Sequence, residues 1–325
     1  YTPRTLFPYT TLFRSSLGTM LSKKMNQIYP LVSIFEKAVC QYNIIAFITF
    51  LLISIIWYYV FVKIVSIKYK AINTGLTTYQ TKSNYKLQSL KVTSPFMALH
   101  RKEMKRFFAS YLYVLNFGMG AVLLLIMSIT CFILGVDKLQ QLVGMPNIRP
   151  IMINFVPFVM SGMLAMTCTT AVSLSLEGKN LWILKSAPIE AATIYRSKMS
   201  VNATILLPIS LLSSLFMSLC LKPTTMSAMW MFVTPLAYVA LTCVWGIFIN
   251  LKMPNFEWES EVTVIKQSMA SVLGILGGML FGFIPMVILL ILPGIDKNLL
   301  TGLITLAVIG FTSFLYIKVC GTKLP

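Results

Sequence analysis

The segment 173–199, SLSLEGKNLWILKSAPIEAATIYRSKM, gathers side chains that suit contact with another molecule. It places Glu177, Lys179, Trp182 and Lys185 before a break at Pro188. Tryptophan is enriched at the centre of protein interfaces, and charged groups add specificity there. Tryptophan is also common at the membrane interface, where its ring anchors helices. These residues therefore predict a contact surface, and they leave open whether it meets a protein or lipid.

A short helix is expected after that break. Glu190 lies near its start, and Arg196 and Lys198 lie near its end. This order of charges is the one that the helix dipole favours.

A second polar segment, 250–268, reads NLKMPNFEWESEVTVIKQS and holds three acids spaced two apart. Glu257, Glu259 and Glu261 stand beside Phe256 and Trp258 in a chain that is otherwise strongly basic. Glu257, Trp258 and Glu261 are candidates for a second contact, with a basic partner surface. A solvated loop whose acids pair with neighbouring Lys and Arg side chains fits the same residues.

The sequence shows no pattern of residues that is typical of a catalytic site. The single histidine is His100, no HExxH motif occurs, and the six cysteines are scattered without CxxC spacing. This pattern predicts no catalytic residue, metal site, cofactor or disulfide. No GxxxxGK[ST] phosphate-binding loop occurs either. We expect the chain not to be an enzyme, so any energised work needs ATP hydrolysis by another subunit.

Seven stretches without Asp, Glu, Lys, Arg or His determine the fold class. They are residues 43–62, 112–134, 151–174, 201–221, 226–249, 269–292 and 299–317. Each matches the ~20 apolar residues that a helix needs to cross a bilayer, and in lipid only helices or closed barrels satisfy their own backbone. The composition agrees, with 57% hydrophobic residues, 11% charged residues and a mean hydropathy of +0.80. We expect an all-α integral membrane protein with seven transmembrane helices.

The net charge of +18 indicates membrane topology rather than nucleic-acid binding. All 27 Lys and Arg residues lie in connectors or at the chain start. Alternate connectors carry eighteen of them on one side and four on the other. The positive-inside rule assigns the richer side to the cytoplasm. The C-terminus of this multi-pass protein is therefore expected in the cytoplasm. Membrane lipids are expected to surround its spans.

An amphipathic helix is expected between the first span and the other six, after a cytoplasmic linker at 63–95. Ser94 and Pro95 form an N-cap and N1 pair. At 100° per residue, one half of the helix carries Phe96, Met97, Leu99, Met104, Phe107, Phe108 and Tyr111, and the other half Arg101, Lys102, Lys105 and Arg106. Such a helix lies in the membrane interface. It is either a surface anchor or an elbow that sets the angle of the spans behind it.

The start of the chain predicts a discontinuity. Residues 1–15, YTPRTLFPYTTLFRS, look like a translated sequencing adapter and are excluded from the fold. Residues 16–62 then hold one span, which is expected to end a first transmembrane half. Residues 96–325 form a second half, with the elbow helix and six spans. We therefore expect a C-terminal fragment whose missing N-terminal half is one of its partners.

Small residues predict how the sixth span packs. Gly274, Gly278 and Gly282 stand four apart on one helical face, a spacing that lets two membrane helices approach closely. A hinge is the alternative interpretation. Prolines interrupt four spans and are expected to kink them; these are Pro157, Pro208, Pro235 and Pro285.

Three segments resemble the permease subunits of type-2 ATP-binding cassette (ABC) exporters, in particular an ABC exporter group of Gram-positive bacteria. They are HRKEMKRFFASYLYVLN, SLEGKNLWILKSAPI and PNFEWESEVTVIKQS, and the resemblance covers residues 96–325. It implies an elbow helix before six spans, and a cytoplasmic loop, residues 177–198, that docks on a separate P-loop ATPase. It also implies a bacterial plasma membrane. The sequence departs from the family in its missing first half and in a short outer connector, 293–298.

Two other functions remain open on the sequence. A polytopic protein that transports nothing, such as an immunity, sensor or assembly factor, fits the same spans. An ion-coupled carrier fits less well, because such carriers usually hold an acid, His or Lys within the membrane. None of the seven stretches contains one.

Overall fold

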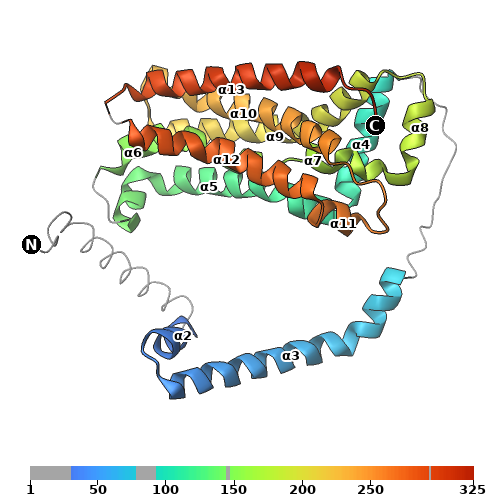
Figure 1. Cartoon of the computed structure of the whole chain (residues 1–325). Helices are drawn as coiled ribbons and strands as arrows, with labels where there is room; N and C mark the ends of the chain where they lie inside the picture. The colour runs from blue at the N-terminus through green and yellow to red at the C-terminus, as the bar shows by residue number, and fades with distance from the viewer. Residues whose placement is uncertain (1–30, 78–92, 144–146, 293) are drawn as a thin grey trace, which may run out of the picture. The chain divides into compact units, whose positions relative to one another are not determined.

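The structure is a computed structural model that describes residues 31–77, 93–143, 147–292 and 294–325. Contacts divide the chain into two units, residues 1–89 and 90–325. Every regular element in the described residues is helical (Figure 1). The proposed adapter, residues 1–15, lies outside the described residues.

The first unit contains α2 (Leu31–Cys40) and α3 (Ile44–Thr77). The Asn43 side chain begins α3, because its oxygen accepts hydrogen bonds from the backbone N–H groups of Ile45 and Ala46 at 3.0 and 3.2 Å. The sequence predicts the end of this span at Val62, and that boundary is wrong. The helix continues to Thr77 because residues 63–74 contain neither Gly nor Pro. The predicted linker at 63–95 therefore starts as helix.

The second unit contains the remaining elements. They are α4 (Pro95–Ala109), α5 (Tyr111–Val143), α6 (Ile148–Ala165), α7 (Thr170–Ser173), η1 (Ser175–Asn180), α8 (Leu181–Ser186), α9 (Ala191–Leu221), α10 (Thr225–Lys252), α11 (Glu261–Lys266), α12 (Met269–Ile291) and α13 (Lys297–Cys320). With α3, the described residues hold seven helices long and apolar enough to cross a membrane. The prediction of an all-α membrane protein with seven spans is confirmed by the number, length and composition of these helices.

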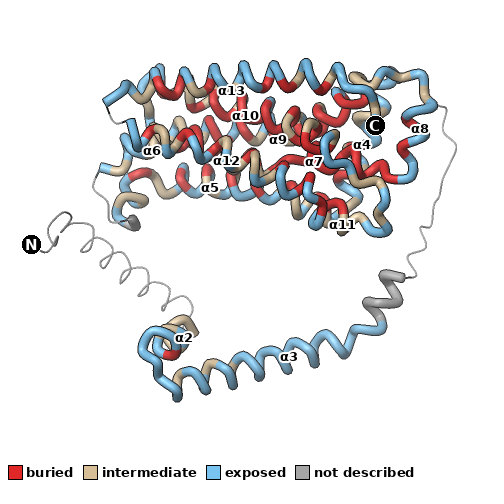
Figure 2. Tube along the Cα trace, viewed as in Figure 1, coloured by how far each residue is buried: buried red, intermediate tan, exposed pale blue. Residues whose placement is uncertain are grey.

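Helix α10 is the centre of the second unit. It packs along α6, α7, α9, α12 and α13, and it buries Tyr238, Leu241 and Ile247. Figure 2 shows buried residues concentrated where the helices face one another, whereas the outer face of α13 is exposed. An outward apolar surface suits lipid, and close packing between helices stabilises the bundle in the membrane.

Gly274, Gly278 and Gly282, the glycines of the predicted face of α12, lie where this helix meets α6 and α7. A Cβ added at Gly274 would collide with the Ala171 side chain, and one at Gly282 would lie 2.5 Å from Cα of Gly162. At Gly278 the nearest atom would be Cβ of Ala165, at 3.0 Å. The absence of side chains on this face lets the backbones approach as the four-residue spacing predicts.

The third predicted span, residues 151–174, is not continuous. Helix α6 ends at Ala165, residues 166–169 are not helical, and α7 then adds four residues. The break is buried, and its backbone groups find partners inside the protein. The Asn202 oxygen accepts from the N–H and hydroxyl of Thr169 at 3.2 and 2.9 Å, and the Tyr113 hydroxyl donates to the Thr169 carbonyl at 2.8 Å. Lipid offers no hydrogen bonds, so a break at this depth requires such partners.

Helix α4 confirms the predicted cap and corrects the predicted faces. The Ser94 hydroxyl accepts from the Met97 N–H at 3.4 Å, and Pro95 occupies N1. However, Glu103 is buried, and Lys102 and Arg106 on the basic half contact protein carboxylates. The basic half of the elbow therefore lies partly inside the protein rather than facing only water and headgroups.

Helix α9 begins ten residues before the apolar stretch 201–221. The sequence predicts a helix in the loop 173–199 with Arg196 and Lys198 near its end, but α9 is continuous from Ala191 to Leu221, with Glu190 as its N-cap residue. No Gly or Pro separates the two predicted parts. Arg196 and Lys198 therefore belong to the same helix as the span, at its beginning. The four helices with internal prolines also continue through them.

Candidate partner-docking site

Helix α8 presents an exposed surface at the end of the bundle that carries the C-terminus (Figure 1). Its Leu181 and Leu184 side chains are buried, whereas Trp182 and Ile183 are 65% and 51% exposed. We call the following exposed residues the α8 surface: Lys179, Trp182, Ile183 and Lys185. Pro188 is exposed in the turn between α8 and α9. The surface combines an apolar centre with two cations, a composition that suits a protein contact.

An ion cluster that is largely buried includes Glu177, which lies shortly before α8 in the chain. We define it as Lys102, Glu103 and Arg106 of α4, Glu177 of η1, and Lys198 of α9. The Lys198 Nζ atom lies 2.8 Å from Oε1 of Glu103 and 2.8 Å from Oε1 of Glu177. The Glu177 Oε2 atom lies 2.7 Å from Nζ of Lys102 and 3.5 Å from Nη1 of Arg106. The cluster thereby joins α4 to η1 and α9, which lie much later in the sequence.

Lys198 is the most buried member of the cluster, with a side chain that is 1% exposed. Its ammonium also donates to the Ser173 carbonyl at 2.8 Å, so its three hydrogens match three acceptors. Arg106 adds a hydrogen bond from Nη2 to the Leu176 carbonyl at 2.9 Å. The charges of the cluster are thus paired, as burial demands, although the buried Nη1 atom of Arg106 has no hydrogen-bond partner among the described residues.

This arrangement corrects the predicted role of Glu177. Its side chain is 3% exposed and accepts hydrogen bonds from Lys102 and Lys198, so it does not lie on the contact surface. A charged residue in a polar loop is normally exposed, and it is buried here because cations from two other helices converge on it. Lys179, Trp182 and Lys185 do lie on the surface, and their contact with a partner stays a prediction.

The second predicted contact segment, 250–268, packs against η1, which precedes α8. The Trp258 indole N–H donates to the Ser175 carbonyl at 2.8 Å. Its ring lies beside Gly178, where an added Cβ would meet it at 3.0 Å and where φ is +52°. Half-buried Trp258 therefore packs within the chain. Glu261 accepts a hydrogen bond from Ser110 at 3.1 Å, and Glu257 is left exposed.

The loop before α8 is also tied to the end of α10. The buried Asn250 oxygen accepts hydrogen bonds from the N–H groups of Leu174 and Ser175 at 2.9 and 3.0 Å. The Asn250 amide donates to the Ser175 hydroxyl at 2.6 Å. These bonds hold η1 against the central helix and so determine where α8 projects.

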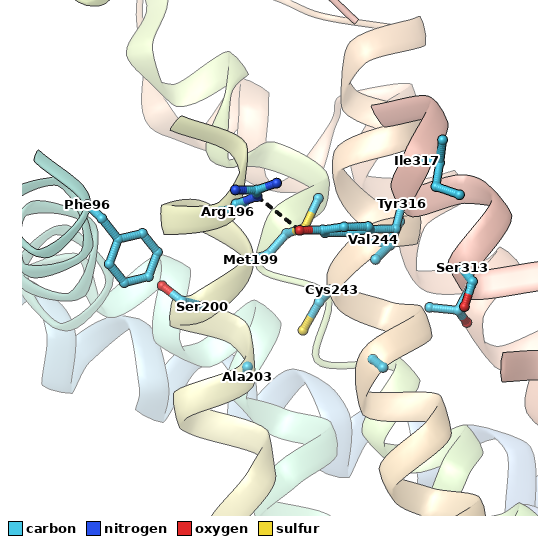
Figure 3. A pocket seen from close by; sticks show the side chains of 12 residues that line it. Phe96, Arg196, Met199, Ser200, Ala203, Cys243, Val244, Ser313, Tyr316 and Ile317 are labelled. Carbon is cyan, nitrogen blue, oxygen red and sulfur yellow. Dashed lines mark hydrogen bonds between the residues drawn. The ribbon is translucent and has the colours of Figure 1, made fainter. Parts of the chain in front are cut away.

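A lateral groove of about 570 Å³ lies between α9 and α13, with α10 as its floor. Figure 3 shows Arg196 at one end of this groove, pointing toward Tyr316 of α13. The Arg196 Nε–H donates to the Tyr316 hydroxyl at 2.9 Å, and the guanidinium carbon lies 6.0 Å from the centre of its ring. Phe96 of α4 and Ser200 of α9 line the side of the groove that lies away from α13.

Sequence reasoning missed several of these residues. Ile183 is part of the α8 surface, and its apolar side chain carries no sequence signal of exposure. Glu103 and Lys198 carry charges that are normally exposed, and their burial follows only from the convergence of α4, η1 and α9. No sequence signal joins positions 103, 177 and 198.

The described residues contain no group of three or more His, Cys, Asp or Glu side chains that could hold a metal ion. What the arrangement offers is a contact surface, a buried ion cluster and a lateral groove. Comparisons with protein-family models, with curated proteins and with solved structures found no match. The function must therefore be argued from these features.

Proposed function

We propose that this chain is the membrane-spanning permease subunit of an ABC exporter driven by a separate cytoplasmic P-loop ATPase. The chain has no phosphate-binding loop of its own, so the proposal assigns ATP hydrolysis to that partner. The order of an elbow helix and six spans, α4 to α13, is the order that the resemblance to type-2 exporters implies. Helix α3 carries an apolar surface that would suit a first transmembrane half or lipid.

The observation that carries the proposal is the connection between the α8 surface and two helices of the bundle. Glu177 precedes α8 by four residues and is held by Lys102 of α4 and Lys198 of α9. Buried, multiply bonded ion pairs keep their geometry better than exposed pairs do. A displacement of α8 by a partner would therefore also move α4 and α9. Such a physical connection is what a transporter needs to pass motion from an ATPase to its spans.

The α8 surface also fits the partner that the proposal names. Trp182 and Ile183 form an apolar centre that a pocket on a soluble protein can enclose. Lys179 and Lys185 flank this centre and match acidic groups on the rim of such a pocket. By the positive-inside rule this end of the bundle faces the cytoplasm, where an ATPase has access to ATP.

The first test is cross-linking from Trp182. A photoreactive phenylalanine analogue replaces Trp182 in the full chain, expressed in a cell that contains its own ATPases. We expect a cross-link to a protein with a P-loop and no transmembrane span. The matched control carries the same analogue at Met226, which is 50% exposed at the opposite end of the bundle, and it gives no such product. Capture of no ATPase from Trp182 favours the alternative of a membrane protein that does not transport.

A second test uses the ATPase that the cross-link identifies. In vesicles that contain both proteins, Trp182→Ala is expected to separate ATP turnover from transport, because it removes the apolar centre of the contact. Interface residues of this type contribute ~2 kcal/mol or more when truncated, so the affinity of the ATPase falls at least about thirtyfold. Membrane insertion stays intact, because Trp182 packs outside the bundle. Unchanged coupling in the variant would contradict the assigned role of α8.

A further inference from the structure

The groove between α9 and α13 opens toward the surface that faces lipid. Its floor is apolar and buried, with Met199, Cys243 and Val244 at 7%, 6% and 5% exposure. On α9 the stripe of Ser200 and Ala203 continues at helical spacing into Leu207 and Leu211, which are exposed. In a bilayer such a groove does not remain empty, and acyl chains are the molecules at hand to fill it. Its volume lies within the usual range of ligand sites.

A cation marks one end of the groove. Arg196 is the sixth residue of α9, roughly 8 Å along the helix from its start at a rise of 1.5 Å per residue. Tyr316 lies in the last turns of α13. An Arg and a Tyr at this depth lie where lipid headgroups meet the hydrocarbon region. None of the salt bridges between described residues involves Arg196.

The guanidinium of Arg196 is also held in place. Its Nε–H is bonded to the Tyr316 hydroxyl, so the side chain lies across the end of the groove instead of moving freely (Figure 3). A planar guanidinium recognises phosphate oxygens with paired hydrogen bonds. The apolar floor and the fixed cation thus match the two parts of one molecule, an acyl chain and an anionic headgroup.

We propose that this groove binds an anionic phospholipid from the membrane, with an acyl chain along the floor and the phosphate at Arg196. A soluble phosphate would meet only one exposed cation, whose attraction is screened by salt. A lipid adds the burial of its methylene groups against Met199 and Val244. A zwitterionic lipid fills the floor equally well, but its ammonium group offsets the attraction to Arg196. The proposal does not depend on the ATPase, because the bilayer supplies the ligand.

The test uses the full chain in nanodiscs that contain trace amounts of two photoreactive lipids, each with a diazirine in the acyl chain. One is a phosphatidylglycerol and the other a phosphatidylcholine. Labelled peptides are identified by mass spectrometry. We expect phosphatidylglycerol to label the groove segments 196–203, 240–244 and 312–317 about fivefold more than phosphatidylcholine does, as one basic residue near a membrane surface implies. Soluble glycerol phosphate is expected not to compete.

Three variants identify the cause of the labelling. Arg196→Gln is expected to lower phosphatidylglycerol labelling of the groove to the phosphatidylcholine level. Lys318→Gln removes an equal charge from an exposed residue of α13 that does not line the groove, and it leaves the ratio unchanged. Ala240→Trp fills the groove from α10 and abolishes labelling by both lipids. Size-exclusion profiles and melting temperatures verify that each variant is folded.

Two results would overturn the proposal. Equal labelling of the groove by both lipids in the unmodified chain would show that Arg196 selects no headgroup. If Arg196→Gln and Lys318→Gln lowered the preference for phosphatidylglycerol equally, the preference would come from the overall basic charge at this end of the bundle and not from Arg196. Because no ATPase is present in the nanodiscs, failure here leaves the proposed transport function to its own tests.

Discussion

Lys198 shows how a single side chain can organise the end of a bundle. It donates to carboxylates on α4 and η1 and to a backbone carbonyl, all at 2.8 Å, from a position with almost no contact with water. A buried ion pair contributes little net stability, because desolvation of the charges offsets their attraction. We infer that its value lies in specificity, because the observed placement of α4, η1 and α9 pairs each of these charges.

Replacement of Lys198 by Met is expected to destabilise the protein strongly. The change keeps the volume of the side chain but leaves the buried Glu103 carboxylate with only the 3.9 and 4.0 Å contacts to Lys102 and Arg106. Loss of one partner from a buried pair costs ~3–5 kcal/mol. A thermal melt of the purified protein measures the effect. Lys179→Met is the matched control, and because Lys179 is exposed we expect its melt to stay close to that of the unmodified chain.

The double variant Lys198→Met with Glu103→Gln separates charge from shape. If an unpaired buried carboxylate causes the loss, neutralising Glu103 restores part of the melting temperature. A double variant that melts below the single one would mean that hydrogen-bond geometry, rather than charge, dominates the cluster.

The break at 166–169 departs from the simple picture of straight membrane helices, and α12 packs against it. The break at 166–169 is maintained by side chains of α5 and α9, and it places α7 against the central helix α10. Helix α12 covers this region and approaches it through a face without side chains. Close backbone contact is a main source of helix association in lipid, where burial of apolar surface gives no advantage over contact with acyl chains. The packing of α12 therefore depends on its glycines.

Gly282→Ala is expected to weaken this packing. The new methyl group would lie 2.5 Å from Cα and 2.7 Å from the backbone nitrogen of Gly162, and a backbone can move only at the expense of the whole helix. Overpacking of this kind costs ~1–3 kcal/mol. Gly310→Ala in α13 is the control, because nothing lies within 4 Å of the added methyl group. We expect a lower melting temperature for the first variant and an unchanged or slightly higher one for the second.

At the scale of the whole chain, the apolar spans indicate a membrane protein, and the basic residues are distributed unequally between its two sides. The connectors on the side of α8 carry eighteen basic residues, and those on the other side carry four. The α8 surface, the ion cluster and Arg196 all belong to the richer side. The proposed interaction with a cytoplasmic ATPase therefore depends on this orientation.

Cysteine labelling in intact cells tests this orientation. In a Cys40→Ala background, which removes an exposed native thiol, Met226→Cys is expected to react with a membrane-impermeant maleimide. Lys179→Cys is expected to react only after the membrane is permeabilised. Both positions are exposed and lie at opposite ends of the second unit, so differences in burial do not explain the result. The reverse pattern would place α8 outside the cell and exclude a cytoplasmic partner there.

The sequence alone was sufficient for the spans because the bilayer imposes a rule that acts locally. Each span needs about twenty residues without charge, and all seven are helical in the described residues, the third with a break at 166–169. The Ser94 cap and the glycine face of α12 were predictable for the same reason, since each depends on residues within a few turns of one helix. Helix ends were less predictable, as in α3 and α9, where no breaker residue follows or precedes the apolar stretch.

Only the tertiary structure decided which polar residues face inward. Glu177 is buried because Lys102 and Lys198 reach it from positions 75 and 21 residues away in the chain. The break at 166–169 has no Gly or Pro to announce it and persists because Tyr113 and Asn202 satisfy its backbone. The groove likewise exists only where α9, α10 and α13 meet. Lipid selects apolar segments along the chain, but the pairing of buried polar groups depends on distances that only the folded bundle sets.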